Sequence, residues 1–265
     1  KSLYKLFNSI IFCSATIAID DSFDFFITQM CLDSISYDKD LKYKKYISPY
    51  FYNDQSKLFV YNTESNLDDI SYVEEIAGLI DNIISNVKNR RILVLCTSFK
   101  QINQFKKILN TTGNKNNFLF QARGLSRDIL INSYLSKPNS VLFGTSTFWE
   151  GIDLPNDKLE ILIIYKIPFS NPSNPIVKAN IDYFQSKNIN SFNEYLLPEA
   201  ILKLKQGFGR LIRNHSDMGV CILTDPRIVK KIYGNKILES FPLEPNLFRE
   251  KTNISIEVNK FFGNK

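Results

Sequence analysis

Two arginines and a glutamine in the last third of the chain have the spacing of a phosphate-binding surface. Gln206, Arg210 and Arg213 occupy positions i, i+4 and i+7, which places them on one narrow stripe of an α-helix. Arginine is always charged and carries a planar set of donors, so two arginines on one stripe suit a polyphosphate. The same spacing also fits a solvated basic face of a surface helix. The pattern predicts a helix over residues 198–214.

The opposite side of this predicted helix is apolar. Phe208, Leu211 and Ile212 point away from the polar stripe and are expected to pack against a core. Gly207 and Gly209 flank the stripe. A glycine in a helix interior costs about 1 kcal/mol relative to alanine, so these two predict the close approach of a bulky group to the backbone.

A run of hydroxyl residues forms a second candidate site. Thr145, Ser146 and Thr147 follow a predicted strand at 140–144 and could donate hydrogen bonds to phosphate oxygens. Two carboxylates and a glycine follow in the same loop and are further candidates: Glu150, Gly151 and Asp153. The alternative is a structural loop, with Trp149 in the core and an aspartate that caps a turn.

Alternating segments predict an α/β fold with a mostly parallel, doubly wound sheet. Residues 67–87 and 99–109 have helical periodicity, and residues 91–98 between them form an apolar run typical of a buried parallel strand. The pattern then repeats with a strand at 117–121, a helix near 126–135 and a strand at 140–144.

Two more hydroxyls, Thr97 and Ser98, lie at the carboxyl end of the predicted strand 91–98. Open α/β sheets bind their ligands at this end of the strands. Ser98 is equally well placed to cap the helix that follows. Nearer the N-terminus, an apolar run at 6–12 fits a buried strand and is followed by Ser14, Ala15 and Thr16.

The composition is that of a soluble globular protein, with 44% hydrophobic and 23% charged residues in a chain of 265. We expect a single domain over residues 1–265, with a less regular tail from about residue 241.

The net charge of +6 fits an anionic partner, although a biased genome gives the same excess of lysine. No apolar run approaches the roughly 20 residues of a membrane span, so we expect a cytoplasmic protein without a membrane partner. The four scattered cysteines predict no metal site.

Several of these segments together resemble the motifs of a known family. The segment from Gln206 to Arg213 resembles the last motif of superfamily 2 helicases, and residues 197–213 are similar to the DinG branch of the XPD-like helicases. Residues 144–155 closely resemble motif V of that branch. The resemblance extends to motif III at 14–16 and motif IV at 97–98, so it covers almost the whole chain in the order that the family has.

The resemblance implies the second RecA-like motor lobe of a DNA helicase. In such an enzyme Arg210 and Arg213 would reach the γ-phosphate of ATP, with Gln206 positioning water or phosphate. ATP and its Mg²⁺ would be bound mainly by the N-terminal motor lobe. Single-stranded DNA would contact Thr97, Ser98 and the three hydroxyls at 145–147. The remaining implied roles are the nucleotide side for Glu150, Gly151 and Asp153, and coupling of hydrolysis to movement for Ser14, Ala15 and Thr16.

The sequence lacks the motifs that bind the phosphates and the metal in such motors. It contains no G-x-x-x-x-G-K-[ST] and no Asp-Glu-Ala-His type of box. We therefore expect the isolated chain not to hydrolyse ATP. The resemblance also implies that the iron–sulfur cluster of XPD-like helicases belongs to the other lobe. The alternative function is a DNA-binding or regulatory module of a DinG-like protein, linked to a nuclease and without helicase activity.

Overall fold

The computed structural model describes residues 4, 6–19, 21–33, 40–111, 117–145, 148 and 159–263. Contacts divide the chain into two compact units. One comprises Lys1–Pro49 with Phe169–Lys205, and the other comprises Tyr50–Pro168 with Gln206–Lys265. We call the second one the sheet unit and the first one the helical unit, and describe each by itself.

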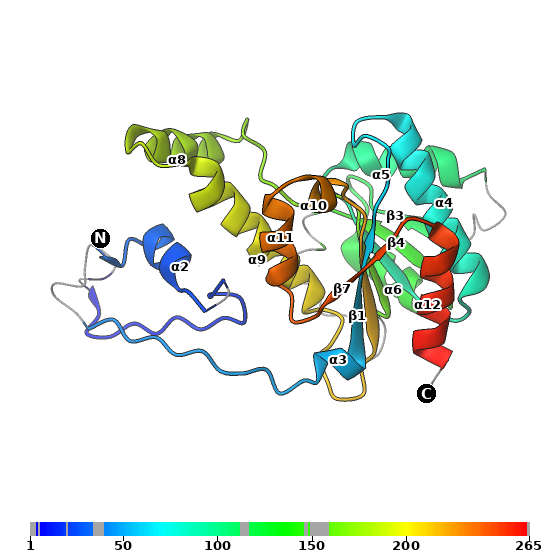
Figure 1. Ribbon diagram of the computed structural model, residues 1–265, viewed down its shortest axis with the longest axis horizontal. Coiled ribbons are helices and arrows are strands. Elements are labelled where there is room, and N and C mark those ends of the chain that lie inside the picture. The colour runs from blue at the N-terminus through cyan, green and yellow to red at the C-terminus, as the bar shows by residue number, and fades with distance from the viewer. Residues whose placement is uncertain are drawn as a thin grey trace. The chain divides into compact units, whose positions relative to one another are not determined.

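The sheet unit is built on seven parallel strands in the order β3-β4-β2-β5-β6-β1-β7 (Figure 1). They are β1 (Ser56–Tyr61), β2 (Ile92–Leu95), β3 (Phe118–Phe120), β4 (Val141–Gly144), β5 (Ile161–Ile164), β6 (Gly219–Leu223) and β7 (Pro245–Phe248). The central strands are apolar at every position because helices cover both faces of a parallel sheet. The predicted α/β fold is confirmed.

Three helices of the sheet unit pack on one face of the sheet. They are α4 (Ile70–Asn86), α5 (Phe99–Leu109) and α12 (Lys251–Gly263). The apolar faces of these helices pack against every second residue of the strands and form one hydrophobic core with them. Val94 of β2 and Ile163 of β5 are examples. The alternation follows from the two-residue repeat of a strand. Shorter helices in the described part of this unit are α3 (Tyr52–Gln55), α6 (Arg127–Ser136), α10 (Arg227–Lys230) and α11 (Tyr233–Glu239).

The C-terminal end is more regular than the sequence suggests. Residues beyond 241 form the edge strand β7, which pairs with β1, and then the 13-residue helix α12. Ile254, Val258 and Phe262 are spaced by four residues and are buried in the core of the sheet unit. The prediction of a looser tail was wrong. Packing of these three apolar residues against the sheet stabilises the helix, and the sequence alone does not show that packing.

The helical unit contains α2 (Asp24–Gln29), α8 (Pro175–Ser186), the π-helix η3 (Phe192–Leu196) and most of α9 (Leu197–Phe208). Asn174 caps α8, since its side-chain oxygen accepts from the backbone N–H of Ile176 at 2.9 Å. A small cluster of Val177, Phe184 and Tyr195 forms the core between α8 and η3. Among the described residues, no helix is long and apolar enough to cross a membrane.

Register aligns the carboxyl ends of the central strands. Leu95 of β2 pairs with Gly144 of β4 and with Ile164 of β5, and Ile164 pairs with Leu223 of β6. The residues that follow these four therefore form rows at one edge of the sheet. The second row contains Thr97, Lys166 and Asp225 from three adjacent strands, which makes this edge polar.

Glu75 of α4 binds three hydroxyls beyond the carboxyl end of β1. Its carboxylate accepts from Tyr61 at 2.7 Å, from Ser65 at 2.6 Å and from Thr63. Partial burial alone would raise the pKa of Glu75, but the three donors outweigh it and hold the pKa below its usual value. The ionised form therefore contributes stability at neutral pH.

We expect Glu75→Gln to lower the free energy of unfolding by roughly 1.5–3 kcal/mol at pH 7, the range for hydrogen bonds to a charged group. Because the pKa of Glu75 is lower in the folded state, this contribution is present above the usual carboxylate pKa and is lost as the pH falls through the folded value. Urea unfolding at pH 7 and at low pH measures it. Glu74→Gln, at the exposed neighbouring position, is the control. Equal loss at both pH values would contradict the assignment.

Candidate functional site

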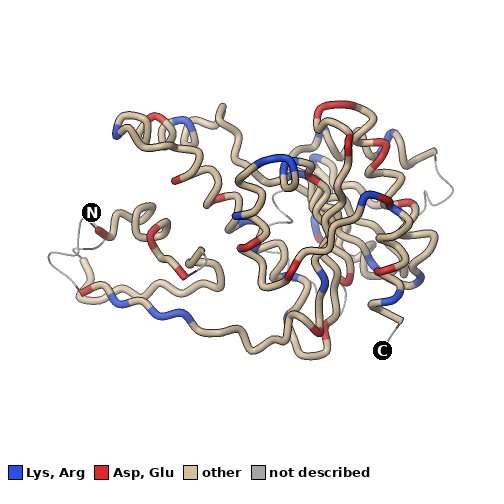
Figure 2. The backbone as a smooth tube through the Cα atoms, viewed as in Figure 1, with Lys and Arg blue, Asp and Glu red and all other residues tan. Residues whose placement is uncertain are grey.

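The carboxyl edge of the sheet brings together polar residues from strands that are distant in the sequence. Basic residues gather just beyond β6, on α10 and the turn after it (Figure 2). They are Arg227, Lys230 and Lys231. A positive edge with hydroxyl and amide groups is suited to an anionic ligand such as the phosphate backbone of a nucleic acid.

Thr145 lies directly after β4 and is buried. Gln121, the first residue after β3, reaches across to it. The amide oxygen of Gln121 accepts from the backbone N–H of Thr145 at 2.7 Å and from its hydroxyl at 3.0 Å. The first of the three predicted hydroxyls is therefore held in one orientation by the neighbouring strand.

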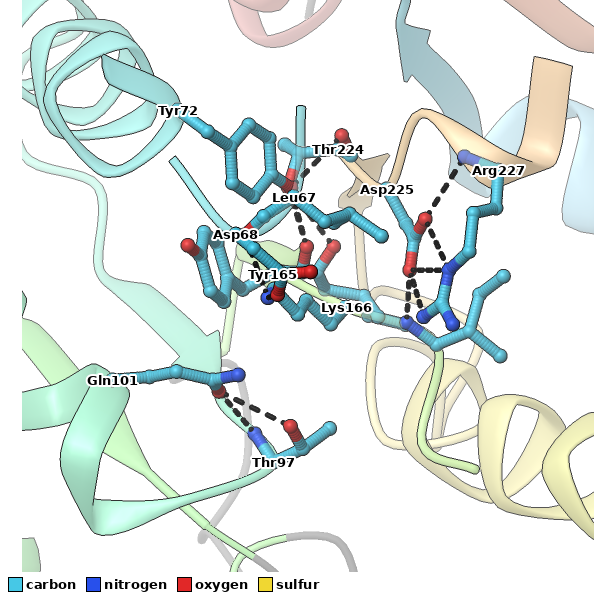
Figure 3. A network of polar contacts seen from close by, with 12 residues as sticks. Leu67, Asp68, Tyr72, Thr97, Gln101, Tyr165, Lys166, Thr224, Asp225 and Arg227 are labelled. Carbon is cyan, nitrogen blue, oxygen red and sulfur yellow. Dashed lines mark hydrogen bonds and ion pairs between the residues drawn. The ribbon is translucent and has the colours of Figure 1, made fainter. Parts of the chain in front are cut away.

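Thr97 has the same kind of partner. The amide oxygen of Gln101, in the first turn of α5, accepts from the Thr97 backbone N–H at 2.8 Å and from its hydroxyl at 3.2 Å (Figure 3). Ser98 is the N-cap of α5 and accepts from the backbone N–H of Gln101 at 3.4 Å. Of the two roles open for Ser98, the structure therefore shows the capping role.

A buried network joins the ends of β5 and β6 to α4. The hydroxyl of Tyr72 donates to the carbonyl oxygens of Tyr165 at 2.8 Å and Thr224 at 3.1 Å. The rings of Tyr72 and Tyr165 stack with centroids 5.0 Å apart. Burial raises the pKa of both phenols. They remain neutral and act as rigid supports for the edge.

Asp225 lies at one end of the second polar row, and its side chain is fully buried. It accepts a two-pronged contact from Arg227, with Nε at 3.0 Å from Oδ1 and an NH2 nitrogen at 2.6 Å from Oδ2. It also accepts from the backbone N–H of Ile167 at 2.8 Å (Figure 3). The carboxylate thus fixes both the loop after β5 and an arginine beside it.

Lys166 lies between these groups. Its ammonium donates to the carbonyl oxygen of Leu67 at 2.8 Å and lies 3.8 Å from the exposed carboxylate of Asp68. Burial lowers the pKa of Lys166, and the carboxylates of Asp68 and Asp225 partly oppose this shift. Sequence reasoning did not single out Lys166 or Asp225 as site residues, although both directly follow apolar strands.

The proposed phosphate-binding arginines do not lie on a continuous helix. Helix α9 ends at Phe208 and the following residues form a turn, in which the Arg210 backbone N–H donates to the carbonyl of Gly207 at 3.2 Å. The predicted helix to residue 214 was therefore too long, because two glycines in three positions favour a tighter turn. The expected burial of Phe208, Leu211 and Ile212 is confirmed.

The turn is held by side chains near the start of β1. The hydroxyl of Tyr50 donates to the carbonyl of Arg213, and the buried carboxylate of Asp217 accepts from the backbone N–H of Arg213 at 2.7 Å. Gln55 donates to the carbonyl of Asn214 at 2.9 Å. Arg210 and Arg213 are both half-exposed, so neither is buried inside the fold.

The structure brings some predicted residues together and separates others. Thr97 and Thr145 follow adjacent strands at the carboxyl edge, whereas Arg213 lies before β6 at the amino edge, beside the residues that lead into β1. Ser146, Thr147, Glu150, Gly151 and Asp153 are outside the described residues. The backbone of Arg213 and that of Thr145 therefore lie at opposite edges of the sheet.

The three predicted coupling residues belong to the helical unit. Ser14 and Ala15 are exposed, and the Ser14 hydroxyl accepts from the backbone N–H of Thr16 at 3.2 Å. The apolar run at 6–12 forms no strand, and Ile11 is 90% exposed. That prediction was wrong, since an apolar run becomes a buried strand only where a sheet offers it a partner.

No three His, Cys, Asp or Glu side chains in the described ranges are arranged to hold a metal ion. The positive groups at the two edges, by contrast, suit phosphate oxygens.

Comparison with known proteins gives these observations a family context. Residues 80–244 match the profile of the helicase C-terminal domain. The chain is 33% identical over 232 residues to the ATP-dependent DNA helicase YoaA of Haemophilus influenzae, an alignment that covers 88% of this chain and 35% of that relative. It is 29% identical over 241 residues to the 3'-5' exonuclease DinG of Bacillus subtilis, covering 89% of this chain and 25% of the relative.

Solved structures agree at the level of the fold. An XPD helicase aligns with a TM-score of 0.56 at 18% identity, over 73% of this chain and 35% of that chain. The Xpd4 protein of S. tokodaii gives 0.57 at 14% identity, over 84% and 47%. The fold is RecA-like, and the chain spans between a quarter and about a third of the length of the curated relatives described above.

Proposed function

Because the chain belongs to the helicase C-terminal domain family, we propose that it is the second motor lobe of an ATP-dependent, DinG-like DNA helicase. The observation that carries this proposal is the polar carboxyl edge of the sheet. There, Thr97 and Thr145 follow adjacent strands and are each oriented by a glutamine. Single-stranded DNA would bind along this edge through its phosphates, which accept from hydroxyl, amide and basic groups.

ATP would bind between this lobe and an N-terminal motor lobe of the same protein. Phosphoryl transfer depends mainly on positioning and charge stabilisation, and an arginine that reaches across from a second lobe contributes orders of magnitude in rate. The half-exposed Arg210 and Arg213 are the candidates for this role, with Gln206 beside them. Glu150, Gly151 and Asp153 would face the nucleotide. Ser14, Ala15 and Thr16 would couple hydrolysis to movement.

Among the described residues, the arginines fit a triphosphate. Arginine guanidinium groups match phosphate oxygens, whereas the described residues offer no set of acidic ligands for Mg²⁺. As the family resemblance implies, the N-terminal lobe would hold most of the ligands of the metal, which neutralises the charge that develops on the phosphates. We place any iron–sulfur cluster outside this chain as well.

The test compares the isolated 265-residue chain with the full-length protein. We expect ATP hydrolysis that is stimulated by single-stranded DNA only in the full-length protein, because the sequence of this chain has no P-loop. Hydrolysis by the purified isolated chain, retained through a second purification, would contradict the proposal.

A second function has support from the relatives. Some are named 3'-5' exonuclease DinG rather than helicase. In such a protein this lobe would bind DNA and regulate a nuclease without driving unwinding. The two functions differ in a strand-displacement assay on the full-length protein. ATP-dependent unwinding supports the motor, and nuclease activity with DNA binding but no ATP hydrolysis supports the regulatory module.

A further inference from the structure

Two glutamines at the carboxyl edge bind two threonines in the same way. In each pair the amide oxygen of the glutamine accepts both the backbone N–H and the hydroxyl of the threonine: Gln121 for Thr145 and Gln101 for Thr97. The two glutamines come from different elements, one from the end of β3 and one from α5. The same arrangement therefore occurs at the ends of the adjacent strands β4 and β2.

This arrangement decides which atoms are available to a phosphate. A hydroxyl has one hydrogen, and at Thr97 it is directed to the Gln101 oxygen at 3.2 Å. The Thr97 hydroxyl oxygen that remains is an acceptor, which a phosphate oxygen would repel. A phosphate oxygen beside Thr97 would therefore need a donor other than this hydroxyl.

The orientation of the Gln101 amide follows from its partners. The backbone N–H of Thr97 is a donor, so the atom 2.8 Å from it must be the amide oxygen and not the nitrogen. The NH2 group then points away from Thr97, as Figure 3 shows. Within the part of the chain that the structure describes, this NH2 group has no hydrogen-bond partner.

Basic side chains follow several strands at this edge, although Arg227 is paired with Asp225 and Lys166 lies near Asp68. The exposed guanidinium of Arg123 lies over the ring of Phe99, the first residue of α5, at 5.8 Å. Lys166 and Arg227 follow the next strands along the same edge. A neutral donor on an edge that also carries cations suits a single phosphate oxygen, because the cations attract the charge and the amide fixes its position.

Building on the proposed function, we propose that Gln101 is a phosphate-binding residue, whose NH2 group donates to the backbone of single-stranded DNA. Thr97 is then a positioning residue, because its backbone N–H and hydroxyl bind the amide oxygen of Gln101 and so orient the NH2 group. Gln101 lies in α5, outside the Thr97–Ser98 motif for which a DNA contact was predicted from the sequence. The contact is uncharged, so it adds affinity without releasing counterions.

The test measures single-stranded DNA binding by the full-length protein, using a fluorescent oligothymidine at several salt concentrations. Gln101→Glu keeps both acceptors for Thr97 but replaces the NH2 group by a carboxylate oxygen. Gln104→Glu places the same charge one turn further along α5 and controls for general repulsion. We expect Gln101→Glu to bind at least about tenfold more weakly than Gln104→Glu, the size expected for a lost hydrogen bond to a charged group, with an unchanged melting temperature.

A third variant separates the donor from charge effects. Gln101→Leu removes the amide without adding charge, and we expect weaker binding with the same dependence of affinity on salt as the wild type. If Gln101→Glu and Gln104→Glu bind alike, Gln101 only supports Thr97 and the inference is wrong, while the proposed function stands. If the wild-type protein itself fails to bind single-stranded DNA, both are wrong.

Discussion

Replacing Arg213 by alanine in the full-length protein is expected to reduce DNA-stimulated ATP hydrolysis by about 10³-fold or more. This is the range found where an arginine supplied from a second element stabilises the charge on a transferring phosphoryl group. The backbone of Arg213 is held from two sides, by the hydroxyl of Tyr50 and the carboxylate of Asp217. A backbone fixed in this way limits the positions of the guanidinium, as catalysis by positioning requires.

Steady-state turnover at saturating DNA measures this effect, and the melting temperature shows whether the variant is folded. Arg213→Lys keeps the charge but loses the planar set of donors, so it should recover only part of the rate. Arg249→Ala removes an exposed arginine just after β7 and is the matched control. Turnover of Arg213→Ala within twofold of the control would remove Arg213 from the proposed site.

The largest effect on stability is expected for Asp225→Ala. The side chain of Asp225 is fully buried and accepts from Arg227 and from the backbone of Ile167. Its removal leaves a largely buried guanidinium and a buried N–H without their acceptor. Breaking one partner of a buried ion pair costs about 3–5 kcal/mol, so we expect a loss of this size in the free energy of unfolding.

Denaturant unfolding of the 265-residue chain, followed by far-ultraviolet circular dichroism, measures the loss. Asp225→Asn keeps one acceptor and should fall between the alanine variant and the wild type. Asp68→Ala removes the exposed carboxylate 3.8 Å from Lys166 and should unfold with the wild type. Equal midpoints for the Asp225→Ala and Asp68→Ala variants would show that the buried pair does not stabilise the edge.

The sheet could be predicted from sequence because its strands are buried on both faces. Residues 92–95 and 161–164 are apolar at every position, and no surface element has that pattern. Register and neighbours could not be predicted in the same way. The row of Thr97, Lys166 and Asp225 depends on strands that are far apart in the chain, and no local pattern links them.

The candidate site was predicted in part. The positions of Thr97 and Thr145 at the carboxyl edge could be predicted because both follow apolar strands, whereas their contact with DNA stays a prediction. Their glutamine partners are separated from them by 4 and 24 positions, and such contacts depend on tertiary packing. The end of α9 was predicted too late in the chain. Leu211 and Ile212 are buried and continue the helical spacing of apolar residues, although the backbone there forms a turn. The predicted roles of the arginines and of the loop at 149–158 stay predictions.

The position of β1 has a consequence for how the chain is made. β1 pairs only with β6 and β7, with Ser56 opposite Gly219. During synthesis the N-terminal part emerges first, so β1 is without its sheet neighbours until most of the polypeptide has left the ribosome. The strands β2, β4 and β5 can associate earlier. Nascent chains that stall before residue 219 should therefore expose the apolar Leu58–Tyr61 segment and need a chaperone to stay free of aggregates.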